Sequence, residues 1–486
     1  MGLPRRFTEH ASVAKLERES FSGFECDASQ PHRTFSMNLP FAMQTLARFL
    51  FTVCLTLALG GMSSFADQAP PLGPGFEPIF DGQTLEGWHA MPHKNPIEFA
   101  AMDDAAQKEQ LEQWWSEASE HWSVEDGTIV NDGEGPFLVS DEEFEDYELY
   151  LEYKTVPLAD SGIYLKGTPQ VQIWDVQNTS QFRHKNYVGS GGLWNNSPGA
   201  KGKDPLMMAD RPIGQWNTVL VRQVGARTTV ILNGRTVVDH ARMENYWDRD
   251  SPLFRSGPIA LQTHGGEIRW RRLAVRRLSP EQANDYLDLH EKVAFRSLFD
   301  GESLQGWTGS VDDYEVVDGA IQCRAGQGGN LLTEEVFSDF QIRLEFKLPP
   351  AGNNGLAIRS PGKGDPAYQS MCELQVLDTE HPKYAGIDPR QAHGSAYGMV
   401  AAKRGFLRNT GDWNFQEVTV EGSKVQVELN GYRILDADLA EVTEFMNDRP
   451  HPGKDRREGH FGFAGHNDPV AFRNIQVRIL PSAKLD

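Results

Sequence analysis

The chain has 486 residues, enough for two or three ordinary domains. Its 68 acidic and 47 basic residues give a formal net charge of −21. Such a surface repels phosphate backbones and anionic lipid head groups, which argues against nucleic-acid and peripheral membrane binding. The 46 glycines and 28 prolines are typical of turn-rich all-β domains rather than of a helical bundle.

The first 66 residues have the pattern of a targeting segment. Arg48 precedes the apolar run 49–59, and small residues follow up to Ser64-Phe65-Ala66, a small-x-small cleavage pattern. The run is too short to span a bilayer as an ordinary helix. We therefore expect residues 1–66 to be an N-terminal extension with a signal peptide. The mature protein is then exported, periplasmic or extracellular, without a membrane span. A buried helix or a membrane anchor is the alternative.

The rest of the chain repeats one ordered set of motifs. Phe80-Asp81-Gly82-x-x-Leu85-x-Gly87-Trp88 returns as Phe299-Asp300-Gly301-x-x-Leu304-x-Gly306-Trp307. The later pairs, in order, are Val124-Glu125-Asp126-Gly127 with Val316-Val317-Asp318-Gly319, Trp216-Asn217 with Trp413-Asn414, Leu232-Asn233-Gly234 with Leu429-Asn430-Gly431, and His264 with His466. This order predicts two homologous domains, 72–280 and 293–486, joined by a polar linker at 281–292.

The elements of these domains are predominantly strands. Residues 101–120 have a helical pattern that the second half lacks, which predicts a helical insertion in the first domain. Residues 147–154 and 340–347 alternate apolar and polar side chains, so we expect one face in a core and the other in solvent. Asn430-Gly431 predicts a type I′ hairpin. Many short strands with such turns favour an all-β sandwich or jelly roll.

Polar residues on neighbouring strands of the second domain are candidate site residues. Residues 354–359 are predicted to form a strand that begins with Asn354 and leads to Arg359. Glu373 and Gln375 share one face of the next strand, as a surface that binds sugar hydroxyls requires. Asp378 is out of phase with Glu373 and joins them only if the strand bends or ends. An ordinary solvent-facing sheet has the same alternation and is the alternative.

Two further candidates lie near the end of the chain. His466 alone would be read as a surface histidine, but its recurrence as His264 favours a site role. Arg473 is as consistent with an inter-strand charge partner as with a site residue. Cys323 and Cys372 either form a disulfide or remain two buried thiols, and no cysteine has zinc-ligand spacing.

With these residues in place, both halves resemble the 3-keto-disaccharide hydrolase domain family, formerly catalogued as a domain of unknown function. The hallmarks in the second half are the opening Phe-Asp-Gly motif, Asn354-Gly355, Glu373-x-Gln375-x-x-Asp378, Gly394-x-x-Tyr397-Gly398, Leu429-Asn430-Gly431, and His466 before Phe472-Arg473-Asn474. The resemblance implies two concanavalin-like jelly-roll domains in tandem, in an exported bacterial protein that acts on carbohydrate. Because family membership indicates a fold better than a reaction, the chemistry must be argued from the site.

The reaction implied by the family can be written in physical terms. A ketone at C3 of a sugar acidifies the hydrogen at C2, so that a base can remove it and the C1 oxygen can leave. The site then needs a base, an acid and a cation at the enolate oxygen. The resemblance offers Glu373, Asp378 and His466 as base, acid or ligands of a divalent metal, and Arg359 and Arg473 as oxyanion partners. It adds Asn354, Gln375 and Tyr397 as substrate-binding residues, and an upstream sugar 3-oxidoreductase as partner.

The first domain departs from this pattern. Gln170 stands in the place of Glu373, while Gln172, Asp175 and Lys166 match Gln375, Asp378 and Arg359. The departure leaves two interpretations: an active variant that uses Asp175 and His264, or a carbohydrate-binding domain. In both, Gln170, Gln172 and Lys166 bind the sugar, and Trp174 and Trp194 stack on it unless they pack in the core.

Three other functions stay open at this point. An ordinary glycosidase needs two carboxylates, but Gln375 stands where a related fold class has the second one, which weakens that interpretation. A non-catalytic tandem carbohydrate-binding protein is the main rival. Two sandwiches that only mediate protein contact would not require the polar clusters.

Overall fold

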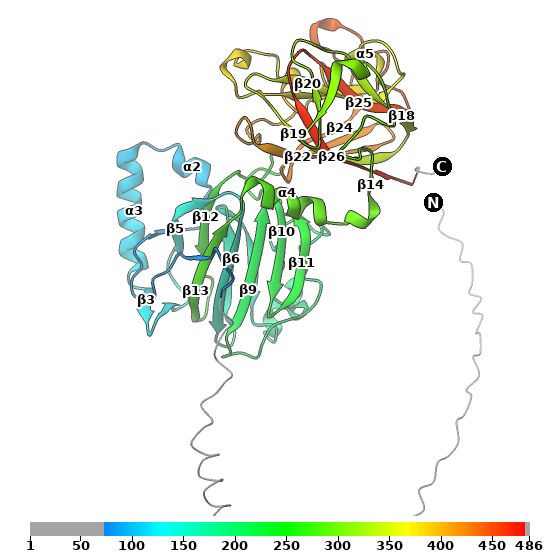
Figure 1. Cartoon of the computed structure of the whole chain (residues 1–486). Coiled ribbons are helices and arrows are strands. Elements are labelled where there is room, and N and C mark those ends of the chain that lie inside the picture. The colour runs from blue at the N-terminus through cyan, green and yellow to red at the C-terminus, as the bar shows by residue number, and fades with distance from the viewer. Residues whose placement is uncertain (1–71, 482–486) are drawn as a thin grey trace, which may run out of the picture. The chain divides into compact units, whose positions relative to one another are not determined.

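The computed structural model describes residues 72–481, which form two all-β jelly-roll sandwiches in succession (Figure 1). Each consists of an eight-stranded and a five-stranded antiparallel sheet. The predicted signal peptide and residues 1–71 as a whole lie outside the described residues. Within residues 72–481, no helix combines the length and apolarity needed to cross a membrane.

The large sheet of the first sandwich has the strand order β11-β10-β9-β6-β13-β4-β3, with β1 paired to β13. The small sheet has the order β2-β5-β12-β7-β8. Their strands are β1 (Glu77–Pro78), β2 (Trp88–Met91), β3 (Trp122–Glu125), β4 (Thr128–Asn131), β5 (Phe137–Phe144), β6 (Tyr147–Thr155), β7 (Asp160–Leu165), β8 (Thr168–Trp174), β9 (Asn217–Val224), β10 (Arg227–Leu232), β11 (Arg235–Arg242), β12 (Gly257–Leu261) and β13 (Ile268–Arg277).

The second sandwich has the same strand order. Its large sheet is β24-β23-β22-β19-β26-β17-β16, with β14 paired to β26, and its small sheet is β15-β18-β25-β20-β21. The strands are β14 (Arg296–Ser297), β15 (Trp307–Gly309), β16 (Tyr314–Val317), β17 (Ala320–Cys323), β18 (Asn330–Phe337), β19 (Phe340–Lys347), β20 (Asn353–Ser360), β21 (Cys372–Leu377), β22 (Trp413–Glu421), β23 (Lys424–Leu429), β24 (Tyr432–Asp438), β25 (Gly459–Gly465) and β26 (Ala471–Ile479).

The cores lie between the sheets, and the predicted strands β6 and β19 cross them. Phe340, Ile342, Leu344 and Phe346 of β19 are fully buried. The opposite face was expected in solvent, and that expectation is wrong. Gln341, Arg343 and Glu345 are also buried, because the chain after the first sandwich covers them: Asn284 Nδ2 donates to Glu345 (3.0 Å), and Arg343 donates to the carbonyl of His290 (2.5 Å).

The Asn-Gly pair at 430–431 makes the hairpin that the sequence predicts, and the matching pair at 233–234 makes a second one. Asn430 and Gly431 have φ of 50° and 83°, and Asn233 and Gly234 have 51° and 76°. A type I′ turn needs positive φ at both central residues, and glycine and asparagine adopt it with little strain. These turns join β23 to β24 and β10 to β11, so that Leu429 pairs with Tyr432 and Leu232 with Arg235.

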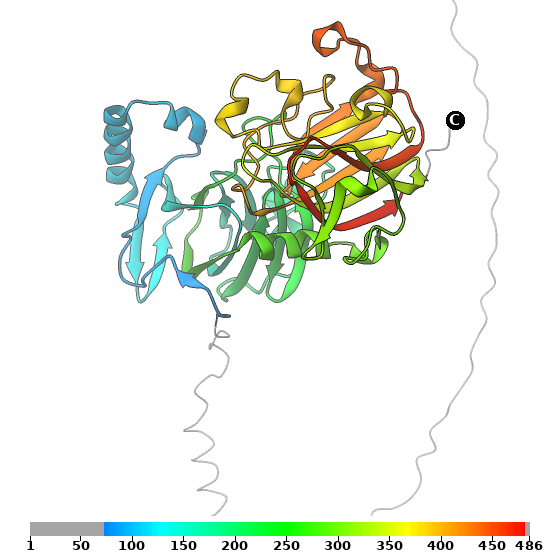
Figure 2. The ribbon, with the colours of Figure 1, turned by 45° about the horizontal axis from the view of Figure 1, so that its top comes forward.

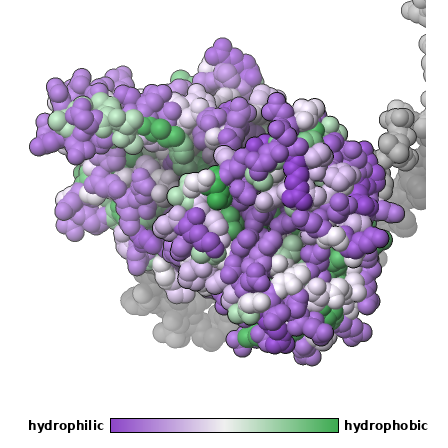
Figure 3. Space-filling model, turned by 90° about the horizontal axis from the view of Figure 1, so that it is seen from above, coloured by the Kyte–Doolittle hydropathy of each residue, from purple (hydrophilic) through white to green (hydrophobic). Residues whose placement is uncertain are grey.

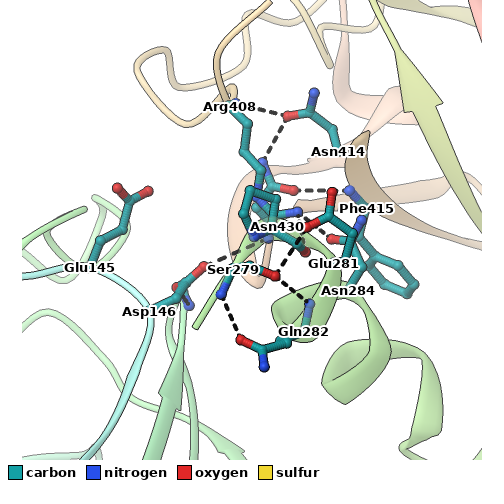
Figure 4. Close-up of polar contacts among 12 residues, drawn as sticks. Glu145, Asp146, Ser279, Glu281, Gln282, Asn284, Arg408, Asn414, Phe415 and Asn430 are labelled. Atoms are coloured by element: carbon teal, nitrogen blue, oxygen red, sulfur yellow. Dashed lines mark hydrogen bonds and ion pairs between the residues drawn. The ribbon is translucent and has the colours of Figure 1, made fainter. Parts of the chain in front are cut away.

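The predicted helical insertion at 101–120 contains α3 (Asp104–Ala118), which packs beside β2 (Figure 2), and a short helix that was not predicted, α2 (Pro96–Ala100), precedes it. The predicted linker contains α4 (Pro280–Leu289). A capping box starts α4, in which the Ser279 hydroxyl accepts from Gln282 N and the Gln282 side chain accepts from Ser279 N (Figure 4). Arg408 holds α4 through Asn284 and the Pro280 carbonyl. A single turn, α5 (Pro366–Gln369), follows β20.

Cys323 and Cys372 are free, buried thiols, so of the two interpretations the sequence left open the disulfide is wrong. Burial raises the pKa of Cys323 to about 11 and that of Cys372 to about 12. The face in Figure 3 is mostly hydrophilic, with scattered apolar residues, as expected from the charged composition.

Candidate functional site

The candidate site of the second sandwich is a cleft of about 240 Å³ over the small sheet, at strands β20 and β21. Glu373 and Gln375 project into it from one face of β21, while Leu374 and Val376 lie in the core. The alternation therefore places the two polar residues as the sequence predicted. The remaining lining residues are Asn353, Asp365, Ala367, Tyr368, Leu377, Tyr384, Ile387, Gln391, Tyr397, Arg449 and His466.

Glu373 and His466 form an ionisable pair in this cleft. The carboxylate Oε1 lies 3.7 Å from His466 Nε2. The Glu373 side chain is 5% exposed, whereas that of His466 is 47% exposed. The neighbouring Glu373 carboxylate raises the pKa of His466 against the opposing effect of burial. A buried carboxylate and an accessible imidazole, one the partner of the other, are groups that can exchange a proton with a bound molecule.

A glycine lets Glu373 reach this histidine. Gly355 of β20 pairs with Gln375, and β20 lies between β21 and β25, which ends at Gly465 just before His466. A Cβ at Gly355 would stand 2.5 Å from Cδ and Cγ of Glu373. The carboxylate therefore crosses β20 where that strand has no side chain.

Polar and aromatic groups complete the cleft. Gln375 Nε2 donates to Asn353 Oδ1 (2.6 Å), which fixes both amides. Gln391 Nε2 donates to the Tyr397 hydroxyl (3.0 Å). The Arg449 guanidinium lies 3.4 Å from the centroid of the Tyr368 ring, and one of its nitrogens is 4.0 Å from Asp365. Arg449 therefore adds a cation to the lining of the cleft.

Two residues matched to the family pattern lie outside the cleft because β20 bulges and β21 ends. The register of β20 shifts between Ala357 and Ser360, and Arg359 has a φ of 52°. Its side chain is fully buried, pairs with Asp339 (2.9 Å) and donates to three backbone carbonyls. Asp378 follows the end of β21, and its carboxylate accepts from Ala351 N (2.9 Å). The expected site roles of Arg359 and Asp378 are therefore wrong.

Arg473 and Asn354 also lie outside the cleft. Arg473 is on β26 of the other sheet, where it pairs with Glu345 (2.8 Å) and stacks on Trp413, with 4.0 Å between guanidinium and ring centroid. This is the charge-partner role that the sequence left open. Asn354 is fully buried on the core side of β20, one residue out of phase with Asn353, which lines the cleft.

A second and larger cleft, of about 500 Å³, lies at the corresponding place of the first sandwich. Asp160 of β7 lies 3.0 Å from His264 Nδ1, and the hydrogen bond between them raises the pKa of His264. Gln172 Nε2 donates to Asp160 Oδ1 (2.7 Å). The other lining residues are His93, Phe137, Tyr164, Gln170, Trp174, Gln181, Arg183, His184, Trp194, Asn195, Gln262 and Thr263.

Asp175 and Lys166 do not reach this cleft. Asp175 accepts from Leu158 N (2.9 Å) and Gln177 N (2.8 Å), as the residue after a strand commonly does. The ammonium of Lys166 is fully buried and donates to the carbonyls of Gly225 and Arg255 and to a tyrosine hydroxyl. Burial lowers its pKa to about 8. Both residues stabilise the fold here, which corrects their expected site roles.

Sequence reasoning missed several cleft residues. Asp160 and Asn353 each stand two positions before a glycine that faces Gln172 or Gln375, so the period of a strand identifies them once the glycines are aligned. Arg449 and Tyr368 come from loops and a single helical turn, which no periodicity marks. Among residues 72–481, no group of three or more His, Cys, Asp or Glu side chains has the arrangement of a metal site.

Comparison with known proteins identifies the domains. The profile of the 3-keto-alpha-glucoside-1,2-lyase-like domain matches residues 75–276 and again residues 294–478. The 3-keto-disaccharide hydrolase of Bacteroides thetaiotaomicron is 28% identical over 225 residues, which cover 38% of this chain and 78% of that protein.

Two solved structures resemble parts of the chain. A provisionally assigned glycosyl hydrolase of Parabacteroides distasonis has a TM-score of 0.36 and 22% identity, and covers 40% of this chain and 97% of its own. The carbohydrate-binding module CBM66 of Bacillus subtilis has a TM-score of 0.26 and 16% identity, with coverages of 36% and 95%. Since the family profile matches both halves over most of the chain, the protein belongs to the family of 3-keto-alpha-glucoside-1,2-lyase-like domains.

Proposed function

We propose that this protein is an exported enzyme that cleaves 3-keto-glycosides in the cleft of the second sandwich. The observation that carries the proposal is the Glu373–His466 pair, a buried carboxylate beside an accessible imidazole in an open cleft. The named activity of the Bacteroides relative supports the substrate class. Because the chain is only 28% identical to that protein, the sugar and its linkage are left to experiment.

Glu373 is assigned as the base. Its carboxylate accepts the proton from C2, and the electron pair of the C2–H bond forms the enolate with the C3 ketone. When the enolate collapses, the C1–O bond breaks, a C1–C2 double bond forms, and the ketone returns. The buried position of the carboxylate strengthens the electrostatic interactions that stabilise this charge transfer.

His466 and Arg449 complete the reaction. His466, whose pKa is raised by Glu373, gives a proton to the leaving oxygen. Arg449 lines the cleft as the cation for the enolate oxygen. Water then adds across the double bond: its oxygen goes to C1, the now neutral His466 takes one of its protons, and Glu373 returns a proton to C2. Release before water adds would make the enzyme a lyase.

The substrate must be oxidised before it reaches this protein. Elimination requires an acidic hydrogen at C2, which an ordinary glycoside lacks because its C3 carries a hydroxyl. An oxidoreductase that converts this hydroxyl to a ketone is therefore the proposed partner. Equally, 3-keto-glycosides should react while the parent glycosides do not.

The test compares aglycone release from 4-nitrophenyl 3-keto-α-D-glucopyranoside and from its parent glucoside. Wild-type protein should release nitrophenol only from the keto form, and Glu373→Gln should lower kcat/KM by about 100-fold or more. Glu380→Gln is the matched control, because Glu380 is an exposed glutamate of the same sandwich outside the cleft. Sugar binding without release from either compound would refute the enzyme and leave a carbohydrate-binding protein.

A further inference from the structure

The cleft of the first sandwich has a floor of buried hydrogen-bond acceptors that lack donors. Gln172 donates to Asp160 and in turn accepts from the Gln170 amide nitrogen. Because a carboxylate only accepts, this series orients both amides and presents Gln170 Oε1 as an acceptor. Gln170 Oε1 and Gln262 Oε1 are both buried without a hydrogen-bond partner among the described residues. Leaving such atoms unpaired costs free energy, so the floor suits a ligand with several hydroxyl donors.

The walls of this cleft add flat apolar surfaces. Trp174 and Trp194 meet edge to face with their ring centroids 5.2 Å apart. The Trp174 indole donates to the Gly189 carbonyl (3.0 Å), which holds its ring in place. The amide oxygens on the floor can accept hydrogen bonds from sugar hydroxyls, and the indole faces on the walls can stack on the ring. This arrangement matches a saccharide ring, which is polar at its edge and apolar on its faces.

In the two clefts, a carboxylate and an amide occupy opposite positions on two neighbouring strands. Gly162 faces Gln172 as Gly355 faces Gln375, so Asp160 corresponds to Asn353 and Gln170 to Glu373. The first cleft therefore has its carboxylate on β7 and its amide on β8, whereas the second has the amide on β20 and the carboxylate on β21. The histidine is present in both, and in both its partner is the one carboxylate on the floor.

We propose that the first sandwich holds a second acid–base site for a 3-keto-pyranose ring, in which Asp160 and His264 take the roles of Glu373 and His466. The reaction assigned to this site rests on the proposed function, but the binding of the ring does not. Asp160 accepts the C2 proton, the C1–O bond breaks, and His264 protonates the leaving oxygen. Both carboxylate oxygens of Asp160 already contact Gln172 or His264, so one of these contacts must break before Asp160 can accept the C2 proton. We therefore expect the reaction to be slower in the first sandwich than in the second.

The experiment measures the activity that remains when the second cleft is disabled. Full-length Glu373→Gln protein should retain slow nitrophenol release from the 3-keto-glucoside. Adding Asp160→Asn or His264→Gln should lower that residual rate at least about tenfold. The control is Asp141→Asn in the same background, because Asp141 pairs with His89 (2.7 Å) in the same sandwich outside the cleft. Circular dichroism melts verify that each variant is folded.

The outcomes separate this inference from the proposed function. A residual rate that Asp160→Asn leaves unchanged overturns the second site while the first proposal stands. If wild-type protein releases no nitrophenol, the proposed function fails, and binding of the same probe is followed by tryptophan fluorescence in Glu373→Gln protein. Binding that Asp160→Asn abolishes then supports the second site, and binding that it leaves unchanged overturns it.

Discussion

The reach of Glu373 across β20 depends on the missing side chain at Gly355, and Gly355→Ala tests this. The backbone there is extended, so alanine adopts it without backbone strain, and the gain of about 0.4–1 kcal/mol through the unfolded state offsets the cost of moving the Glu373 side chain. The new Cβ would stand 2.5 Å from Cδ and Cγ of Glu373, whereas ordinary contact begins at 3.4 Å. The carboxylate must therefore move by about 1 Å, and a displacement of this size can lower kcat about 100-fold.

The assay pairs kcat for the 3-keto-glucoside with a thermal melt. We expect a loss of about 2.7 kcal/mol in transition-state stabilisation and a melting temperature close to that of wild type. Gly386→Ala is the matched control, because a Cβ there meets nothing within 4 Å. A folded Gly355→Ala protein with kcat within threefold of wild type would refute the position assigned to the carboxylate.

Four further predictions follow from the described contacts. Arg359→Met should destabilise the second sandwich by about 3 kcal/mol, seen in denaturant melts, because it leaves a buried charge partner and three carbonyls unpaired. The pKa of His466 in NMR titrations should lie above its ordinary value and fall in Glu373→Gln. The stabilisation from this pair is complete below the ordinary histidine pKa and is lost as pH rises through the raised one. Cys323 and Cys372 should resist thiol reagents at neutral pH until the chain unfolds, as mass mapping would report. Dialysis against EDTA, followed by addition of Mn²⁺ or Mg²⁺, tests the divalent metal that the family resemblance allows. Because Glu373 and His466 supply only two ligands, we expect activity to depend on the ion only at high ion concentration, and full activity after chelation would exclude a required ion.

The fold and part of the site could be predicted from sequence because strand periodicity determines faces. The alternation around Glu373 and Gln375 placed both in the cleft, and the Asn-Gly pairs gave the hairpins. Periodicity fails where a strand is irregular. Arg359 follows a bulge with positive φ, so counting along the strand points it to the wrong place.

Residues contributed by loops could not be predicted for a different reason. Arg449 is more than 70 positions after Glu373 in the chain, and only the folded loops bring it to Tyr368. Burial on the outer face of β19 was missed because the covering segment belongs to the linker, whose docking no local pattern shows. Such contacts depend on tertiary packing, which overrides what alternation alone suggests.

The geometry of the small sheet explains why the carboxylate can lie on different strands in the two sandwiches and still contact the corresponding histidine. In both sandwiches the histidine follows the strand next to β7 or β20. Asp160, on β7, is therefore adjacent to His264, and a short side chain reaches it at 3.0 Å. Glu373 lies one strand further away, so it needs a longer side chain and passes over Gly355, and it reaches His466 only to 3.7 Å. The strand nearer to the histidine thus carries the shorter aspartate, and the more distant strand carries the longer glutamate. In each sandwich the length of the side chain matches the distance between its strand and the histidine.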